Sequence, residues 1–63
     1  MYYVEVYYLS KMNFTGRKMQ HYEEKEAEVN YLRTIGKLTA EKKTGLVCLR
    51  SDDHDLIKSE LLK

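Results

Sequence analysis

The side chains with the greatest potential for chemistry lie in the stretch SDDHD at residues 51–55. Three carboxylates and one imidazole occur within residues 52–55, and such groups bind metal ions or transfer protons. Consecutive positions do not readily converge on one ion, however, and no second set of ligands accompanies them at a recognisable spacing. Aspartates at a helix start also satisfy its unpaired N–H groups and its dipole. We therefore interpret these residues as a helix cap and expect no metal site.

Cys48 is the only cysteine of the chain, and it is a candidate nucleophile that His21 or His54 could activate. Both histidines are distant from it in sequence, so only the fold could bring one beside the thiol. The apolar run LVCLR at residues 46–50 instead predicts a small buried hydrophobic residue. A single cysteine also excludes a disulfide within the chain, and no Cys/His spacing typical of zinc sites is present.

The paired carboxylates of EEKEAE at residues 23–28 could in principle serve acid–base catalysis. They surround a lysine at the expected start of a helix, which is typical of a solvated helix face. The three glycines, at positions 16, 36 and 45, are too scattered for a phosphate-binding loop, and no nucleophile-elbow pattern occurs. We therefore expect a protein that is not an enzyme and binds no cofactor.

The elements that must position these residues follow from hydrophobic periodicity. Alternation of period two predicts a strand at residues 2–10, and the polar segment that follows predicts a hairpin turn and a second strand. Helix-forming residues with acids in the first turn predict the main helix, and an apolar run of strand length follows Gly45. The predicted elements are a strand at 2–10, a turn at 12–16, a strand at 17–22, a helix at 23–37, a strand at 45–50 and a helix at 52–62.

These elements predict one compact α+β domain over residues 1–63, since so short a chain cannot build a second core. We expect a two-layer β-β-α-β arrangement with an antiparallel three-stranded sheet in the order 2-1-3. The main helix would cover one face of the sheet, through a stripe formed by Val29, Leu32, Ile35 and Gly36. A short C-terminal helix would follow the third strand.

Charge and composition restrict the class of protein. The chain carries 11 basic and 10 acidic residues, and this interspersed net charge of +1 lacks the basic field typical of nucleic-acid-binding proteins. No segment resembles a signal peptide or a membrane span, and we expect a cytoplasmic protein. A core of this size rarely supplies more than about 3–5 kcal/mol, so dimerisation or a bound partner would supplement its stability.

The main functional hypothesis concerns the back of the first strand, which carries unusually many aromatic side chains. Tyrosine is enriched in protein interfaces because it offers a large contact area and a polar tip. We therefore expect a non-catalytic protein-binding module that occludes or bridges a partner, as small phage or mobile-element inhibitors of host enzymes do. The predicted partner-binding residues are Tyr3, Glu5, Tyr7, Leu9 and Tyr22.

Alternatives remain open at this point. The C-terminal helix could cover the tyrosine face through Leu56, Ile57 and Leu61, and partners would then pair with the exposed edge of the second strand. The same face could instead join two copies of the chain in a homodimer. A nucleic-acid-binding domain is a further alternative, in which bases would stack on the sheet and lysines would hold the phosphates. The residues for that alternative are Lys11, Arg17, Lys18, Lys42 and Lys43.

Overall fold

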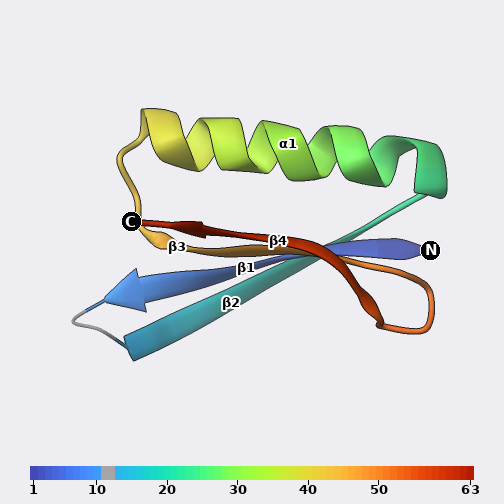
Figure 1. The fold of residues 1–63 in the computed structure, drawn as a ribbon, viewed down its shortest axis with the longest axis horizontal. Coiled ribbons are helices and arrows are strands. Elements are labelled where there is room, and N and C mark those ends of the chain that lie inside the picture. Colours follow the sequence, from blue (N-terminus) through green and yellow to red (C-terminus); the bar gives the residue numbers. More distant parts are fainter. Residues whose placement is uncertain (11–12) are drawn as a thin grey trace.

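The computed structural model has one helix and four strands in the order β-β-α-β-β (Figure 1). It describes the backbone of residues 1–10 and 13–63 and the side chains of residues 1–9 and 18–63. The elements are β1 (Tyr2–Ser10), β2 (Asn13–Tyr22), α1 (Glu24–Ala40), β3 (Gly45–Arg50) and β4 (Leu56–Leu62). The α+β class is confirmed, but the sheet has four strands and not three.

The sheet is antiparallel throughout, with the strand order β2-β1-β3-β4. The two strands with the most apolar sequences, β1 and β3, occupy its centre, where both of their edges are hydrogen-bonded. Val4 and Val6 of β1 lie in register with Leu49 and Val47 of β3, and all four are buried beneath α1. This alternating set forms the core and fixes which sheet face is covered.

Helix α1 contacts the sheet through a stripe different from the predicted one. Its buried residues are Ala27, Tyr31 and Leu38, with Ile35 packed against them. Val29 and Leu32, which were expected to face the sheet, are 52% and 58% exposed. Both sets have spacings of three or four residues, so periodicity alone could not distinguish them. Gly36 is also exposed, and the helix continues beyond it to Ala40.

The prediction of a C-terminal helix is wrong, because residues 56–62 form the edge strand β4. This strand pairs with β3 from Gly45↔Leu62 to Arg50↔Leu56, with a register shift near Arg50. The segment LIKSELL alternates almost as well as it fits a helix, and short apolar runs are ambiguous in this respect. Pairing with β3 satisfies backbone groups that would otherwise lie along an open sheet edge, which favours the strand.

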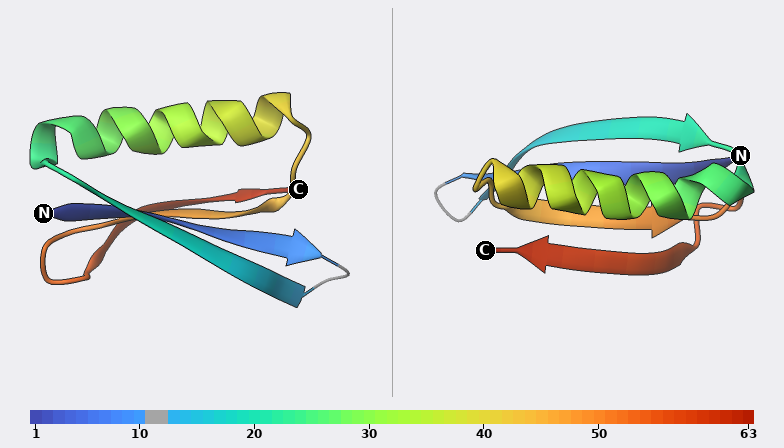
Figure 2. Two further views of the ribbon diagram at one scale, coloured as in Figure 1. Left: turned by 180° about the vertical axis from the view of Figure 1, so that it is seen from behind. Right: turned by 90° about the horizontal axis from the view of Figure 1, so that it is seen from above.

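The layers therefore differ from the prediction in one important way. Helix α1 lies along one face of the sheet, and no other element of the described residues lies over the second face (Figures 1 and 2).

The predicted turn at 12–16 overlaps β2, which begins at Asn13; Lys11 and Met12 lie outside the described residues. No helix in the described part of the chain is long and apolar enough to cross a membrane.

Candidate functional site

The sheet face opposite α1 is the candidate functional site, and we call it the open face. Residues that pair across antiparallel strands share a face, so the register identifies its members. The open face consists of Tyr3, Glu5, Tyr7 and Leu9 of β1, Met19 and His21 of β2, Leu46, Cys48 and Arg50 of β3, and Ser59 and Leu61 of β4. Ile57 joins it by alternation along β4, as the extra residue at the register shift where Arg50 pairs with Leu56. Four of the five predicted partner-binding residues lie on it.

An ion pair occupies the centre of the open face. The Nε of Arg50 donates a hydrogen bond to the carboxylate of Glu5, which is only 4% exposed. The hydroxyl of Tyr7 donates to the same carboxylate at 3.2 Å. Arg50 also donates from Nη1 to the backbone oxygen of His54 at 2.9 Å, so it links the sheet to the β3–β4 loop. The hydrogen bond to Glu5 raises the pKa of Arg50, and these bonds hold the central side chains in one arrangement.

Aromatic rings form one end of the open face. The ring of Tyr3 stacks on that of His54, with centroids 4.7 Å apart, and meets the ring of His21 edge-on at 4.8 Å. The fold thus brings both histidines to one tyrosine. They lie 33 positions apart in the chain, which is why no spacing in the sequence indicated this contact.

Apolar side chains form the β4 side of the open face. Ile57 and Leu61 are 46% and 48% exposed, and Leu61 lies in register with half-buried Leu46. Leu46 in turn lies in register with Tyr7, so an apolar strip crosses three strands. Ile57 and Leu61 were expected in a C-terminal helix that could cover this face, and Arg50 was not among the predicted site residues. The signal available for Arg50 was the opposite charge of Glu5 on a neighbouring strand.

Cys48 lies at the centre of this face but is 2% exposed. Burial raises the pKa of its thiol, and the nearby Glu5 acts in the same direction, whereas Arg50 opposes the shift. A thiol that is buried and stays protonated is a poor nucleophile. This placement agrees with the interpretation of Cys48 as a packing residue.

We expect Cys48 to react with a disulfide reagent such as DTNB at least about tenfold more slowly in the native protein at pH 8 than in guanidinium. In the native protein, burial limits the access of the reagent to the thiol and lowers the fraction of Cys48 that is present as thiolate. Stopped-flow absorbance of the released thiolate would measure both rates. Free cysteine in the same two solutions controls for the effect of guanidinium on the reagent. Equal rates in the folded and unfolded chain would show that the thiol is accessible.

Tyr22 is the one predicted partner-binding residue that lies elsewhere. It pairs with Tyr2 at the end of β2, and both pack against the core on the side of α1. Its hydroxyl is bonded to the side chain of Gln20. The structure therefore does not bring Tyr22 together with the other four.

Two residues of the nucleic-acid alternative, Lys18 and Lys43, lie away from the open face. Lys18 and Lys43 line a cleft beside α1, on the opposite side of the sheet from Tyr3 and Tyr7. Lys42 is exposed in the loop that follows α1. Lys11 and the side chain of Arg17 lie outside the described part of the structure. Of the predicted phosphate-binding residues whose side chains are described, Lys18 and Lys43 do not share a face with Tyr3 and Tyr7.

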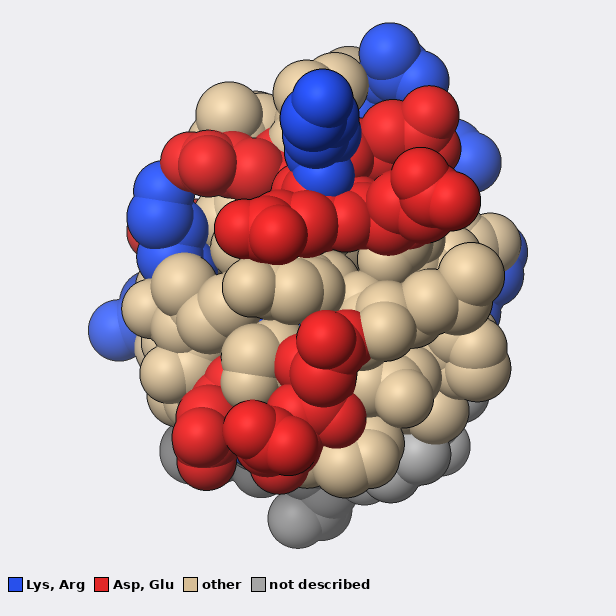
Figure 3. Space-filling view, turned by 90° about the vertical axis from the view of Figure 1, so that its right-hand side faces the viewer, with Lys and Arg blue, Asp and Glu red and all other residues tan. Residues whose placement is uncertain are grey.

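The aspartates of residues 52–55 do not cap a helix, because they form the loop between β3 and β4. Asp52 pairs with the N-terminal amine of Met1, and acidic side chains gather at this end of the molecule, near the start of α1 (Figure 3). Among the residues whose side chains are described, no three His, Cys, Asp or Glu residues are grouped in a way that could hold a metal ion.

Comparisons with models of protein families, with curated proteins and with solved structures find no match to this chain. The function proposed below therefore depends on the geometry of the chain itself.

Proposed function

We propose that this protein is a non-catalytic module that binds a partner protein through the open face of its sheet. The main support for this proposal is that the single helix covers one face of the four-stranded sheet and leaves the other face exposed (Figure 2). The exposed face presents half-buried Tyr3, Tyr7 and Leu9 together with exposed Ile57 and Leu61. A contiguous apolar and aromatic surface on a small protein usually marks an interaction site.

The arrangement of the open face suits binding. Aromatic and aliphatic side chains surround a hydrogen-bonded ion pair, and Tyr and Arg are among the residues most enriched at the energetic centres of interfaces. The bonds of Arg50 to Glu5 and to the His54 backbone already order its side chain. Binding would then lose less side-chain entropy than it would with a mobile arginine. A partner would gain a preformed surface that extends over β1, β3 and β4.

A protein of this kind acts by occupying a surface of its partner or by bridging two partners. Occlusion of a host enzyme, as by a small phage or mobile-element inhibitor, is the form of this function that we favour. It requires no catalytic group on the chain, and it fits a rigid sheet face better than a flexible tail. The fold supplies rigidity because the core beneath α1 fixes the twist of the strands that carry the open face.

The test is a matched pair of substitutions, Leu61→Lys on the open face and Leu32→Lys on the outer side of α1. The two leucines are 48% and 58% exposed, so both variants should fold. We expect Leu61→Lys to weaken partner binding by about tenfold or more, because a charge would enter an apolar contact. Leu32→Lys should bind as the unmodified chain does. Tagged proteins would be used to recover the partner from a nuclease-treated lysate of the native host, and the affinity for the purified partner would then be measured.

Circular dichroism of both variants would establish that they fold. Equal binding by both folded variants would refute the open face as the interaction surface. A second copy of the chain is the other occupant to consider, and sedimentation of the purified protein distinguishes it. If the chain alone is a dimer that Leu61→Lys converts to a monomer, the open face is a homodimer interface and the proposal of a different partner protein fails.

A further inference from the structure

A cleft on the opposite side of the sheet has a distinct chemical character, and we call it the basic cleft. It lies between α1 and β2, because α1 runs above β1 and β3 and leaves β2 projecting beyond it (Figure 2). Its volume is about 250 Å³. The proposed partner-binding function does not use this cleft, since the open face lies on the other side of the sheet.

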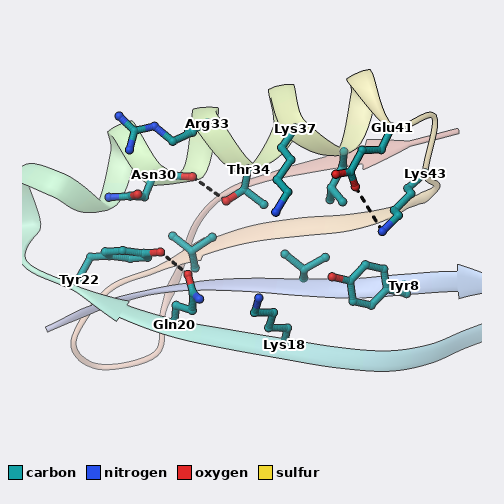
Figure 4. Close-up of a pocket in the computed structure, with 13 residues that line it drawn as sticks. Tyr8, Lys18, Gln20, Tyr22, Asn30, Arg33, Thr34, Lys37, Glu41 and Lys43 are labelled. Carbon is teal, nitrogen blue, oxygen red and sulfur yellow. Dashed lines mark hydrogen bonds and ion pairs between the residues drawn. The ribbon is translucent and has the colours of Figure 1, made fainter.

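Positive side chains enter the basic cleft from both of its walls. Lys37 of α1 and Lys18 of β2 point toward one another across it (Figure 4). Neither of them forms an ion pair with a carboxylate among the residues whose side chains are described. Arg33, one helical turn before Lys37, turns outward at the rim (Figure 4). The ammonium groups of Lys18 and Lys37 repel each other across the cleft. An anion between the two walls would relieve this repulsion.

One carboxylate, that of Glu41, also lines the basic cleft, and it is already paired. Its Oε1 lies 3.2 Å from the Nζ of Lys43. The pair is at the end of the cleft near the loop after α1, beyond Lys37 (Figure 4). The charge that remains between Lys18 and Lys37 is therefore positive.

The remaining residues that line the basic cleft are apolar, aromatic or polar without charge, and the polar ones, Gln20, Asn30 and Thr34, are already hydrogen-bonded. Val4, Val6 and Leu38 form its floor, and all three are buried. The hydroxyl of Tyr8 points into the cleft from one end, and the ring of Tyr22 lies at the other end (Figure 4). The space thus combines two ammonium groups and a hydroxyl donor with an aromatic ring and an aliphatic base.

We propose that the basic cleft binds a small phosphate monoester whose organic part contains a planar ring, such as a nucleoside monophosphate. The phosphate lies between Lys18 and Lys37 and accepts a hydrogen bond from Tyr8, and the ring packs on Tyr22. Ammonium groups are well suited to phosphate, and planar rings stack on tyrosine irrespective of their hydrogen-bonding edges.

The dimensions of the basic cleft set the size of the ligand. Sites for small molecules usually measure about 300–1,000 Å³, so a cleft of this volume holds a compact ligand and not a larger cofactor. The cleft continues past Tyr22, Asn30 and Arg33 into a more open recess that Lys25, Glu26 and Val29 also line. A ring placed on Tyr22 would extend toward this recess.

The experiment is a titration of the ¹⁵N-labelled protein with adenosine 5′-monophosphate, followed by heteronuclear NMR. We expect saturable shifts centred on the amides of Lys18, Tyr22 and Lys37. Inorganic phosphate should give the same shifts near Lys18 and Lys37 with about tenfold weaker affinity, since it lacks the ring. Adenosine without phosphate should show no saturation at the same concentrations.

Lys37→Gln and Lys63→Gln form the matched pair of variants, because each removes one exposed positive charge and Lys63 lies at the chain end next to β4. Lys37→Gln should weaken binding of the nucleotide by about tenfold, whereas Lys63→Gln should leave it unchanged. The spectra themselves report that each variant is folded. The absence of saturable shifts, or equal affinities of the two variants, would overturn the proposal. Equal affinity for inorganic phosphate and the nucleotide would overturn the part of it that concerns the ring.

Discussion

Replacement of Gly45 by alanine is expected to lower the free energy of unfolding by about 2–3 kcal/mol. Gly45 is the first residue of β3, and it pairs with Tyr8 of β1 on one side and with Leu62 of β4 on the other. A Cβ at this position would overlap the carbonyl oxygen of Tyr7 and lie 3.4 Å from its carbonyl carbon. These are backbone atoms of the central strand, which cannot rotate away as a side chain can. The strands must separate to accept the methyl group.

The consequences of that separation extend to neighbouring hydrogen bonds. Thr44 accepts a hydrogen bond from the amide of Leu9 at 3.1 Å and donates one from its hydroxyl to the Leu9 oxygen at 3.1 Å. Both bonds lie next to the position where the Gly45→Ala methyl group would be. Since the core of such a domain supplies only about 3–5 kcal/mol, a loss of this size would unfold a measurable fraction of the protein at 25 °C.

Gly36→Ala is the matched control for Gly45→Ala, and it should have the opposite sign. A Cβ at Gly36 would meet nothing within 4 Å, and the residue lies inside α1. Alanine should therefore raise the free energy of unfolding by about 0.5–1 kcal/mol through its higher helix propensity. Urea unfolding followed by circular dichroism measures both changes. A Gly45→Ala variant as stable as the original chain would show that the contact between β1 and β3 is looser than described.

The strands β1 and β3 were predictable because the hydrophobic pattern of each sequence indicates which of its faces are buried. β1 alternates between two faces, and residues 46–49 of β3 form a continuous apolar run, which is typical of a strand buried on both faces. The predicted ranges 2–10 and 45–50 match the observed strands. The antiparallel contact between the first and third strands also followed, because a helix that crosses the sheet returns the chain to that side.

The conformation of residues 56–62 could not be predicted in the same way, because it depends on pairing with β3. Leu56–Leu62 satisfies both periodicities, and the choice is made by the free edge of β3, which is not visible within seven residues of sequence. The same error left open whether Tyr3 and Tyr7 are covered. A helix at 52–62 could have covered them, whereas the strand extends their face with Ile57 and Leu61.

The central ion pair and the basic cleft each combine residues that are far apart in the sequence and are brought together by the fold. Glu5 and Arg50 are 45 positions apart and meet only because β1 pairs with β3 in one register. Lys18 and Lys37 line one cleft because α1 lies above β1 and β3 and leaves a space over β2. Sequence patterns predicted the faces of individual strands, but these pairs require the tertiary arrangement.

The rotation of α1 about its axis is the feature on which the basic cleft depends, and one pair of substitutions tests it. Leu38 and Leu32 belong to the same helix and have the same side chain, but they are 5% and 58% exposed. Leu38→Ala should lower the free energy of unfolding by about 2–4 kcal/mol, because it leaves a cavity above the sheet. Leu32→Ala should change it by less than about 0.5 kcal/mol.

The predicted stripe of Val29, Leu32 and Ile35 would give the reverse order, with Leu32→Ala the more destabilising change. Urea unfolding of the two variants therefore decides between the two orientations of α1. The result also bears on the basic cleft, since Lys37 precedes Leu38 and enters the cleft only when Leu38 faces the core. If Leu32→Ala were the more harmful substitution, Lys37 would be directed away from Lys18, and the proposed phosphate site would lose one of its two walls.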